Sequence, residues 1–527
     1  MSLRNRLVVP VILAGLAVLA GCGGGTFNRS TPPPTGSFSN SDLNGTYVFS
    51  AVGSDSSGAF FALVGTLAAN GSGGITGGTL DLNDPIIGVF PGLVISSGTY
   101  KITSDGRGTA TLNTSQGSIG LAFVLSSSSH GLVTRYDTSG TGSGTLDLQS
   151  TLTQSQIAGS YAFNFTGISS LNTTTGAQPT LATVGAFTLD ASGNMTSGVE
   201  DFNNNGSSIA LTSLALSGSV NLATVPGVAT LTTSAGTLNF DVYPVDATHL
   251  KLVEVDAAPI MVGDAFTQTS SIPTGPNVFT VAGFDTIALG PFTAAGIIVT
   301  DGNGNVTGGS EDINDFLVAS TVTNFTGSYP ALSGGRSVLT LAGFDNGANG
   351  ILCTACQFAA YPSSGGLQLL EIDSAGSTNG IAYPQTPTAL ASAQGYGLNL
   401  TGVNFGNGTP FEEDDVAEFT NTSGSFAGLI DYNDQGSLSP DQKFSATYAA
   451  DATINGRGTI ASSSFNLVSY GVDSSTTVFV EVDNNQLGLG SFGLQAPTAK
   501  SNIAAMHLAA LHLRPGARNA WRPNKPK

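Results

Sequence analysis

Short runs along the chain alternate apolar and polar positions, and turn residues such as glycine, asparagine and proline separate them. In the run SYAFNF, the side chains of Tyr161, Phe163 and Phe165 occupy every second position, which is the period of a strand with one buried face. The run TLNFDVYPV, residues 237–245, alternates in the same way. Between residues 160 and 268 the pattern predicts about eight short strands joined by tight turns, which is typical of an antiparallel meander.

This pattern recurs four times along the chain, at a spacing of about 110 to 120 residues. The copies open on the related strands TYVFSAVG, SYAFNFTG, NVFTVAGF and GYGLNLTG. Each copy then contains an Asp-x-Asn-[Asp/Asn] motif, a strand ending in Glu-x-Asp or a variant of it, and a closing glutamine. Because the repeat is too long for a solenoid, each copy is expected to be a domain with its own core.

The repeats predict an all-β chain of four tandem domains, at residues 41–150, 151–270, 271–387 and 388–497. Each domain is expected to be a roughly eight-stranded antiparallel meander that closes into a β-barrel, because closure removes exposed strand edges. A β-sandwich of similar strand number is the alternative. The opening Gly-x-Tyr strand and the strand number resemble lipocalin and avidin-type barrels in topology, and this resemblance implies an interior that holds a small apolar ligand.

At the start of the chain, two arginines precede an apolar stretch, residues 7–20, that is too short to span a membrane. The stretch ends in Leu-Ala-Gly-Cys, which resembles the lipobox of bacterial lipoproteins. This resemblance implies a signal peptide at residues 1–21 and lipidation of Cys22. Residues 22–40, rich in Gly, Ser, Thr and Pro, are predicted to be a flexible tether. The basic residues 498–527 are predicted to form a disordered tail, or a patch that contacts anionic lipid or polymer.

The composition narrows the range of partners. The formal net charge is -19, and only 10% of the residues are charged. Because nucleic-acid binding requires a basic surface, nucleic acid is excluded as a partner of the four domains. As a whole, the chain resembles uncharacterised bacterial envelope lipoproteins built from tandem Gly/Ser/Thr-rich β-domains, a family that implies no activity.

The Asp-x-Asn motif is the first candidate site. Its carboxylate and amide oxygens, at alternate positions, are ligands that calcium takes, and no other cofactor is predicted. One motif supplies about three of the six to eight oxygens that calcium needs, so Asx turns at strand ends are the alternative interpretation. The candidate calcium ligands are Asp81, Asn83, Asp201, Asn203, Asp312, Asn314, Asp431 and Asn433.

Two further patterns carry possible chemistry. Glu254, Glu371 and Glu481 each precede an aspartate by two residues, which places both carboxylates on one face of a strand. Paired carboxylates can hydrolyse glycosides, but a sugar cannot pass between two acids on one strand, so a polar strand rim is the preferred interpretation. Cys353 and Cys356 are predicted to form a local disulfide in an oxidising compartment.

The sequence therefore predicts a non-enzymatic protein, lipid-anchored to a bacterial membrane and facing the periplasm or the cell surface. The outer membrane is the expected site of the anchor. Adhesion, scaffolding or binding of an unidentified envelope or extracellular partner is the expected role, since repeated weak sites gain avidity. Binding of a small apolar ligand inside the barrels is the alternative. A hydrolase is disfavoured because no catalytic set is complete.

Overall fold

The computed structural model describes residues 38–205, 210–344, 346–347, 350–351, 353–386, 390–406 and 410–496. The chain divides into two units, Met1–Pro32 and Pro33–Lys527, and every described residue lies in the second unit. The predicted signal peptide, Cys22, the tether up to residue 37 and the basic tail therefore lie outside the described residues. Within the described part, no helix is long and apolar enough to cross a membrane.

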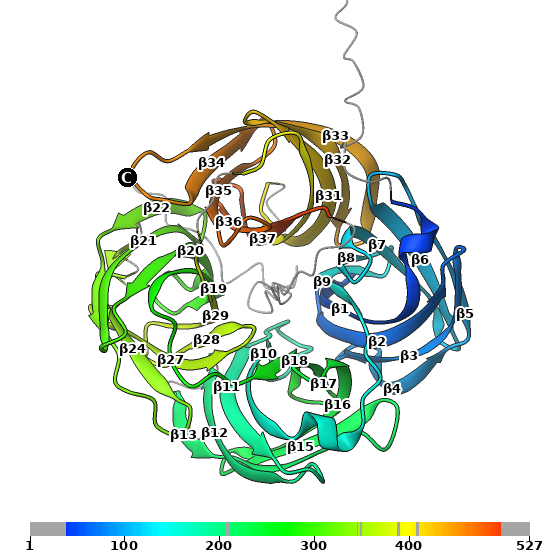
Figure 1. Cartoon of the computed structure of the whole chain (residues 1–527), viewed down its shortest axis with the longest axis horizontal. Coiled ribbons are helices and arrows are strands. Elements are labelled where there is room, and N and C mark those ends of the chain that lie inside the picture. The colour runs from blue at the N-terminus through cyan, green and yellow to red at the C-terminus, as the bar shows by residue number, and fades with distance from the viewer. Residues whose placement is uncertain are drawn as a thin grey trace, which may run out of the picture. The chain divides into compact units, whose positions relative to one another are not determined.

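The described residues form four antiparallel β-barrels in chain order, as the alternating pattern predicts (Figure 1). A short 3₁₀ helix, η1 (Asn40–Asp42), precedes the first barrel. The strands of barrel 1 are β1 (Asn44–Asp55), β2 (Phe60–Asn70), β3 (Gly74–Asp84), β4 (Gly88–Ile95), β5 (Ser97–Ile102), β6 (Arg107–Thr114), β7 (Gly117–Ser127), β8 (His130–Asp137) and β9 (Gly140–Leu148). Barrel 1 closes because β9 pairs with β1, and both β4 and β5 pair with β3.

Barrel 2 follows a second 3₁₀ helix, η2 (Gln154–Ile157), and repeats this topology. Its strands are β10 (Gly159–Ile168), β11 (Thr180–Leu189), β12 (Met195–Asn204), β13 (Leu211–Ala215), β14 (Ser217–Asn221), β15 (Gly227–Thr233), β16 (Gly236–Asp246), β17 (His249–Glu254) and β18 (Ile260–Thr267). These are the eight strands that the alternating pattern predicts, with the fourth broken into β13 and β14. A bridge between Asn194 and Ser219 closes the barrel.

Barrel 3 also has a broken fourth strand, formed by its fourth and fifth segments. Its strands are β19 (Gly275–Asp285), β20 (Gly290–Thr300), β21 (Asn305–Asp315), β22 (Val318–Thr323), β23 (Thr326–Ser328), β24 (Ser337–Ala342), β27 (Cys356–Ser363), β28 (Gly366–Glu371) and β29 (Gly376–Pro384). A separate hairpin, β25 (Asn346–Gly347) and β26 (Gly350–Ile351), lies between β24 and β27 in the chain.

Barrel 4 is an eight-stranded closed barrel, and its fourth strand is continuous. Its strands are β30 (Gln394–Asn404), β31 (Phe411–Thr422), β32 (Ser425–Asp434), β33 (Ser437–Ala450), β34 (Arg457–Ser462), β35 (Asn466–Gly471), β36 (Thr476–Glu481) and β37 (Gln486–Leu494). All four copies are thus barrels and not sandwiches. Their first and last strands are paired in every case.

A glycine in each opening strand permits this pairing of the first and last strands. A Cβ atom at Gly53 would lie 2.1 Å from the carbonyl oxygen of Thr141 on β9, and one at Gly167 would lie 1.8 Å from that of Ile260 on β18. Both distances are far below van der Waals contact, so any larger residue would force the two strands apart. The glycine that ends the opening motif of each copy therefore serves barrel closure.

Inward-facing aromatic residues fill the interior of barrel 2, as the alternation predicts. Tyr161, Phe163 and Phe165 are buried, and the rings of Phe163 and Phe165 stack with centroids 4.6 Å apart. Phe240 of β16 packs against Phe165 from across the barrel. Barrels 1 and 3 hold comparable clusters of buried aromatic and aliphatic side chains.

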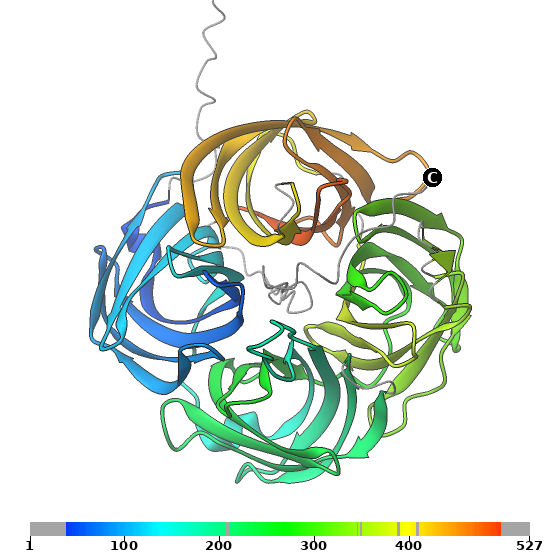
Figure 2. The same ribbon diagram turned by 180° about the vertical axis from the view of Figure 1, so that it is seen from behind.

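Within the unit of residues 33–527, the outer faces of the barrels pack against one another around a ring (Figures 1 and 2). Apolar clusters join barrel 1 to barrel 2, barrel 2 to barrel 3, and barrel 3 to barrel 4. A fourth cluster, with Val416 of β31 against Val124 and Leu132 of barrel 1, joins barrel 4 to barrel 1. The ring is therefore closed.

Candidate functional site

The Asp-x-Asn motifs lie at the four contacts between successive barrels, which we call joints and number by their barrels. In joint 1–2, the side-chain amide of Asn83 donates to the carbonyl oxygens of Glu254 and Asp256 of barrel 2, at 2.8 Å each. The same contact recurs in every joint. In the other joints the side-chain amide of the motif asparagine also donates to main-chain carbonyl oxygens. The pairs are Asn203 with Glu371 and Gly376, Asn314 with Glu481, Asp483 and Gln486, and Asn433 with Arg135 and Gly140.

The aspartate two residues earlier forms an ion pair in three of the joints. In joint 3–4, Asp312 accepts hydrogen bonds from Nε and Nη2 of Arg457 at 2.7 and 2.8 Å, and from the hydroxyl of Tyr470. Equivalent pairs are Asp201 with Arg336 in joint 2–3 and Asp431 with Arg107 in joint 4–1. The predicted calcium ligands thus make protein contacts between barrels. Calcium binding by them remains an untested prediction.

Joint 1–2 differs, because Asp81 faces the carboxyl of Asp241 and the hydroxyl of Tyr243 instead of an arginine. Burial, together with Asp241, raises the pKa of Asp81 to about 7, although the Tyr243 hydroxyl and the amide of Gly92 lower it. A second contact crosses this joint, where Lys251 of barrel 2 lies 3.6 Å from the carboxylate of Asp147 in barrel 1.

The Glu-x-Asp strands end at the joints, where their carbonyl oxygens receive the motif asparagines. The glutamates are buried, and burial raises the pKa of Glu254 to about 9. The aspartates instead accept hydrogen bonds from a neighbouring strand: Asp483 accepts from the main-chain and side-chain nitrogens of Asn466 at 2.8 and 2.6 Å. The two acids of each strand therefore occupy different environments.

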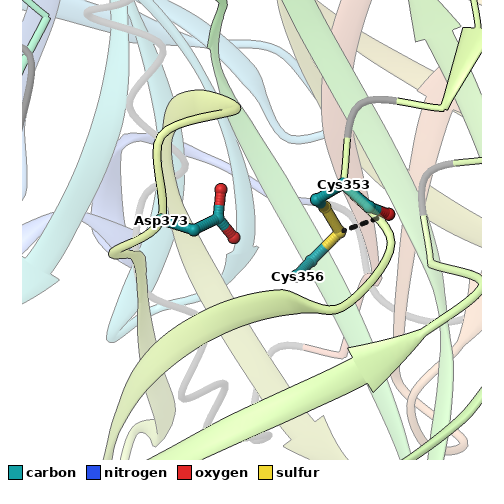
Figure 3. A group of neighbouring side chains, drawn as sticks. All are labelled: Cys353, Cys356 and Asp373. Carbon is teal, nitrogen blue, oxygen red and sulfur yellow. Dashed lines mark hydrogen bonds between the residues drawn. A yellow bond between two sulfur atoms is a disulfide. The ribbon is translucent and has the colours of Figure 1, made fainter.

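Cys353 and Cys356 are joined by a disulfide bond next to Asp373 (Figure 3). Ligand atoms of these three residues lie within 4.8 Å of one another. Both sulfurs are in the disulfide, and the Asp373 carboxylate accepts from the amides of Gln357 and Ala375 at 2.7 and 2.8 Å. This group therefore has no free thiolate to bind a metal ion.

The two histidines of the described region each pair with a carboxylate in the barrel wall. Nδ1 of His130 lies 2.7 Å from Asp147, and Nε2 of His249 lies 2.6 Å from Asp264. Lys251 also contacts Asp264, at 3.0 Å. Although burial opposes ionisation, Lys251 and His130 hold the pKa of Asp147 below its ordinary value.

The interior of barrel 4 contains a cavity of about 470 Å³. Its wall combines apolar side chains, neutral polar side chains and four carboxylates, on Glu413, Asp415, Asp434 and Glu481. The lining residues are Leu398, Leu400, Asn404, Glu413, Asp415, Ala417, Ile430, Tyr432, Asp434, Ser439, Gln442, Phe444, Ser464, Phe465, Leu467, Glu481, Asn485 and Gln486. Gln442, Ser464 and Asn485 are exposed, so the cavity reaches the protein surface.

The acids gather at one end of the barrel because the strands that carry them begin or end there. Glu413 of β31 pairs across the sheet with Asp434 at the end of β32, and Glu481 ends β36. Oε2 of Glu413 accepts from the side chain of Asn404 at 3.0 Å, and Oε1 accepts from that of Gln486 at 3.1 Å. Glu413 is thus held in place by two neutral amides.

Two of these acids are buried and carry at least one carboxylate oxygen without a hydrogen-bond partner among the described residues. Asp415 is 2% exposed and Glu481 is 1% exposed. Oδ1 of Asp415 and both carboxylate oxygens of Glu481 accept no hydrogen bond there. Because an unpaired buried carboxylate is costly, this part of the cavity is electrostatically incomplete.

The pKa values reflect this crowding of acids. Burial raises the pKa of Asp415 well above its ordinary value, and repulsion from Glu413 and Asp434 adds to the effect. Burial and Glu413 raise the pKa of Asp434 to about 6. Burial, followed by Glu413 and Asp483, likewise raises the pKa of Glu481. A cation in the cavity would favour the ionised forms of these groups.

In barrels 1–3, apolar or small neutral residues stand where barrel 4 has Glu413 and Asp415. Strand pairing places Glu413 opposite the motif glycine Gly402 and Asp415 opposite Leu400. The equivalents of Glu413 are Phe61, Leu181 and Phe292, and those of Asp415 are Leu63, Thr183 and Ala294. All six equivalents are buried. A cavity of barrel 3 lined by Phe292 and Phe344 is only about 10 Å³, the size of one water at most.

The acids of β31 are not among the site residues predicted from the sequence. Their signal is the run FEEDD, residues 411–415, in which acids occupy a strand that is apolar in the other copies. Within this run the acids alternate between the two faces of the strand. Glu413 and Asp415 line the cavity, whereas Asp414 accepts a hydrogen bond from Ser143 of barrel 1 at 2.7 Å.

No protein-family model matches the chain, and no curated protein matches it. Among solved structures, the chain is similar to transferrin binding protein B of Haemophilus parasuis, a vaccine antigen, at 11% identity over 73% of this chain and 86% of that chain, with a TM-score of 0.18. It is also similar to transferrin binding protein B of Neisseria meningitidis, at 10% identity over 69% and 84% of the two chains, with the same TM-score. At this TM-score the likeness carries no argument about function.

Proposed function

We propose that this chain is a non-enzymatic, lipid-anchored protein of the bacterial envelope that binds a small molecule inside barrel 4. The observation that carries the proposal is the cavity of about 470 Å³, which reaches the surface. Ligand sites in proteins typically have volumes of about 300–1,000 Å³, with a largely apolar wall and a few polar groups. The envelope location rests on the Leu-Ala-Gly-Cys sequence that ends at Cys22.

Two features favour a ligand-binding role for the interior of barrel 4 over a purely structural one. The strand positions that fill the other barrels with Phe61, Leu181 and Phe292 carry Glu413 in barrel 4, so this interior is left open. Large-to-acidic changes in a barrel interior cost stability, and such departures from good packing are expected at functional sites. Of the Glu-x-Asp pair at the end of β36, only Glu481 lines the cavity, so the two paired carboxylates that the sequence offers for hydrolysis do not both face it, which favours binding.

The test uses the neutral apolar fluorophore N-phenyl-1-naphthylamine, whose emission rises in an apolar environment. We expect saturable binding to the purified chain, with one site per chain. The matched variant Glu413→Phe/Asp415→Leu carries the side chains of barrel 1 at both positions and should lose at least about tenfold in affinity, because they fill the cavity. Binding that is absent from the original chain, or unchanged in this variant, would overturn the proposal.

A further inference from the structure

We infer that the ligand of barrel 4 is an organic cation, an amine with an apolar body, whose charged end lies among Asp415, Glu481 and Asp434. This inference rests on the proposed function, since it assumes that the cavity is the binding site. It names the chemical class of the ligand from the distribution of charge and apolar surface in the wall.

The first observation is an excess of carboxyl groups without a basic residue beside them. Four carboxylates line the cavity, and none of its described lining residues is Lys, Arg or His. In joint 3–4, by contrast, the buried acid Asp312 is paired with Arg457. In barrel 1, the position of Glu481 is occupied by Arg135, which lies over the ring of Phe61. A cation that enters the cavity of barrel 4 would therefore supply the basic partner that these carboxyl groups lack.

The second, independent observation is the state of the individual oxygens. Both oxygens of Glu481 and Oδ1 of Asp415 have no hydrogen-bond partner among the described residues, although both side chains are buried and line the cavity. An ammonium group at this end of the cavity would offer hydrogen-bond donors to such oxygens, which in the described residues have none. These are charge-assisted bonds, the stronger kind.

The third observation distinguishes an organic cation from a metal ion. A divalent metal would occupy only the acidic end, and its volume is far below about 470 Å³. The remaining wall combines neutral polar side chains with apolar ones, which are carried by Leu398, Ala417, Ile430, Phe444 and Leu467 among others. This surface suits the hydrocarbon part of an amine, and the ring of Phe444 adds an aromatic face. Calcium or another divalent ion is the competing occupant in the test.

The experiment compares two probes that share an apolar dye and differ in charge. Dansylcadaverine carries a primary ammonium on an apolar dye, and its N-acetyl derivative is neutral. We expect the purified chain to bind the cationic probe at least about tenfold more tightly than the neutral one at pH 7.5. We also expect this preference to shrink at pH 5, because Asp434, whose pKa is raised to about 6, is then protonated and the cation must displace its proton.

The decisive variant is Asp415→Asn/Glu481→Gln, which keeps the shape of the cavity and removes two carboxyl groups. It should lose the preference for the cationic probe and bind the neutral one within about threefold of the original affinity. Its melting temperature should rise, because two buried unpaired carboxylates are removed, so a folding defect is not expected. As the control, Asp473→Asn removes one exposed carboxylate of barrel 4 outside the cavity and should leave both affinities unchanged.

The outcomes separate the inference from the proposed function. Equal binding of the two probes, with loss of both in Glu413→Phe/Asp415→Leu, would overturn the organic cation and keep the ligand site. Displacement of dansylcadaverine by micromolar calcium would assign the acids to a metal and also overturn the inference. Binding of neither probe would overturn the proposed function together with it.

Discussion

Joints 3–4 and 1–2 use the same main-chain contact but opposite electrostatics. In both, a motif asparagine, Asn314 or Asn83, donates to carbonyl oxygens at the end of the neighbouring Glu-x-Asp strand. In joint 3–4 the motif aspartate is neutralised by Arg457, whereas in joint 1–2 Asp81 faces another acid, Asp241.

The difference shows which part of the joint is common to all four copies. All four joints retain the asparagine, but joint 1–2 lacks the arginine and carries the salt bridge of Lys251 to Asp147 at another place. The amide therefore sets the geometry of the contact, because it satisfies carbonyl oxygens that end a strand. The intact ion pair contributes little to the free energy of unfolding. Removal of one partner is costly, because it leaves the other charge buried and unpaired.

The largest effect is expected from Arg457→Ala. This change leaves Asp312, which is 1% exposed, without its counter-charge, and the free energy of unfolding should fall by about 3–5 kcal/mol. Urea unfolding followed by circular dichroism measures the loss. In the double variant Arg457→Ala/Asp312→Asn the loss should be clearly smaller, because no buried charge is stranded. A single variant within about 1 kcal/mol of the original chain would show that joint 3–4 is as tolerant as joint 1–2.

A smaller effect, of opposite sign, is expected from Asp81→Asn. The folded chain retains a proton on Asp81 up to about pH 7, whereas the unfolded chain releases it near 3.8, so folding binds a proton between these values. Stability contributed by this group is therefore complete below pH 3.8 and is lost as the pH rises through about 7. Between pH 5 and 7.5 the loss should be about 2 kcal/mol, and Asp81→Asn should abolish it.

The measurement is urea unfolding of both chains at several pH values, read as the difference between them, since other buried acids titrate in both. Asp241→Ala is the matched control. The equivalent of Asp241 in barrel 1 is Ala122, and its removal should take away only the minor part of the pH dependence, because burial is the larger cause of the shift. A constant difference from pH 5 to 7.5 would show that Asp81 does not titrate in this range.

The smallest effect is expected from removal of the shared contact. Asn314→Ala leaves the carbonyl oxygens of Glu481, Asp483 and Gln486 without the side-chain amide, and about 1–2 kcal/mol should be lost. Asn83→Ala in joint 1–2 should cost a similar amount, since the contact is the same. Asn303→Ala, at an exposed turn of barrel 3, is the control and should change stability by less than about 0.5 kcal/mol. A thermal melt of each variant would contradict this view if only Asn314→Ala lowered the melting temperature.

The barrels could be predicted from the sequence because their causes are local. The alternation of Tyr161, Phe163 and Phe165 fixes which face is buried, and the repeated landmarks fix the number of copies. The joints could not be predicted, because Asn83 contacts a strand end 171 residues away in the chain. Local spacing suggested a calcium loop at the same residues, since oxygen-rich side chains look alike whether they bind a metal or a neighbouring domain.

The cavity of barrel 4 could be predicted from the sequence only in part. Comparison of the copies places acids in β31 where Phe61 and Leu63 fill barrel 1, so the sequence contained the signal. Its meaning required the closed barrel, because only the strand register brings Glu413 and Asp415 together with Glu481 of β36. A run of acids in a strand is otherwise indistinguishable from a solvated edge.

The closure of the ring by Asn433 on barrel 1 constrains how a gene for such a chain can change. Every joint is head-to-tail, so a row of barrels presents an asparagine at one end and bare strand-end carbonyls at the other. Four copies bring these ends together. A duplication to five copies, or a deletion to three, would require a new angle at every joint or would leave two complementary ends that join separate chains into polymers. The angle at each joint therefore fixes the number of barrels in the ring. The barrels can diverge in their interiors, as barrel 4 has, but their number cannot change.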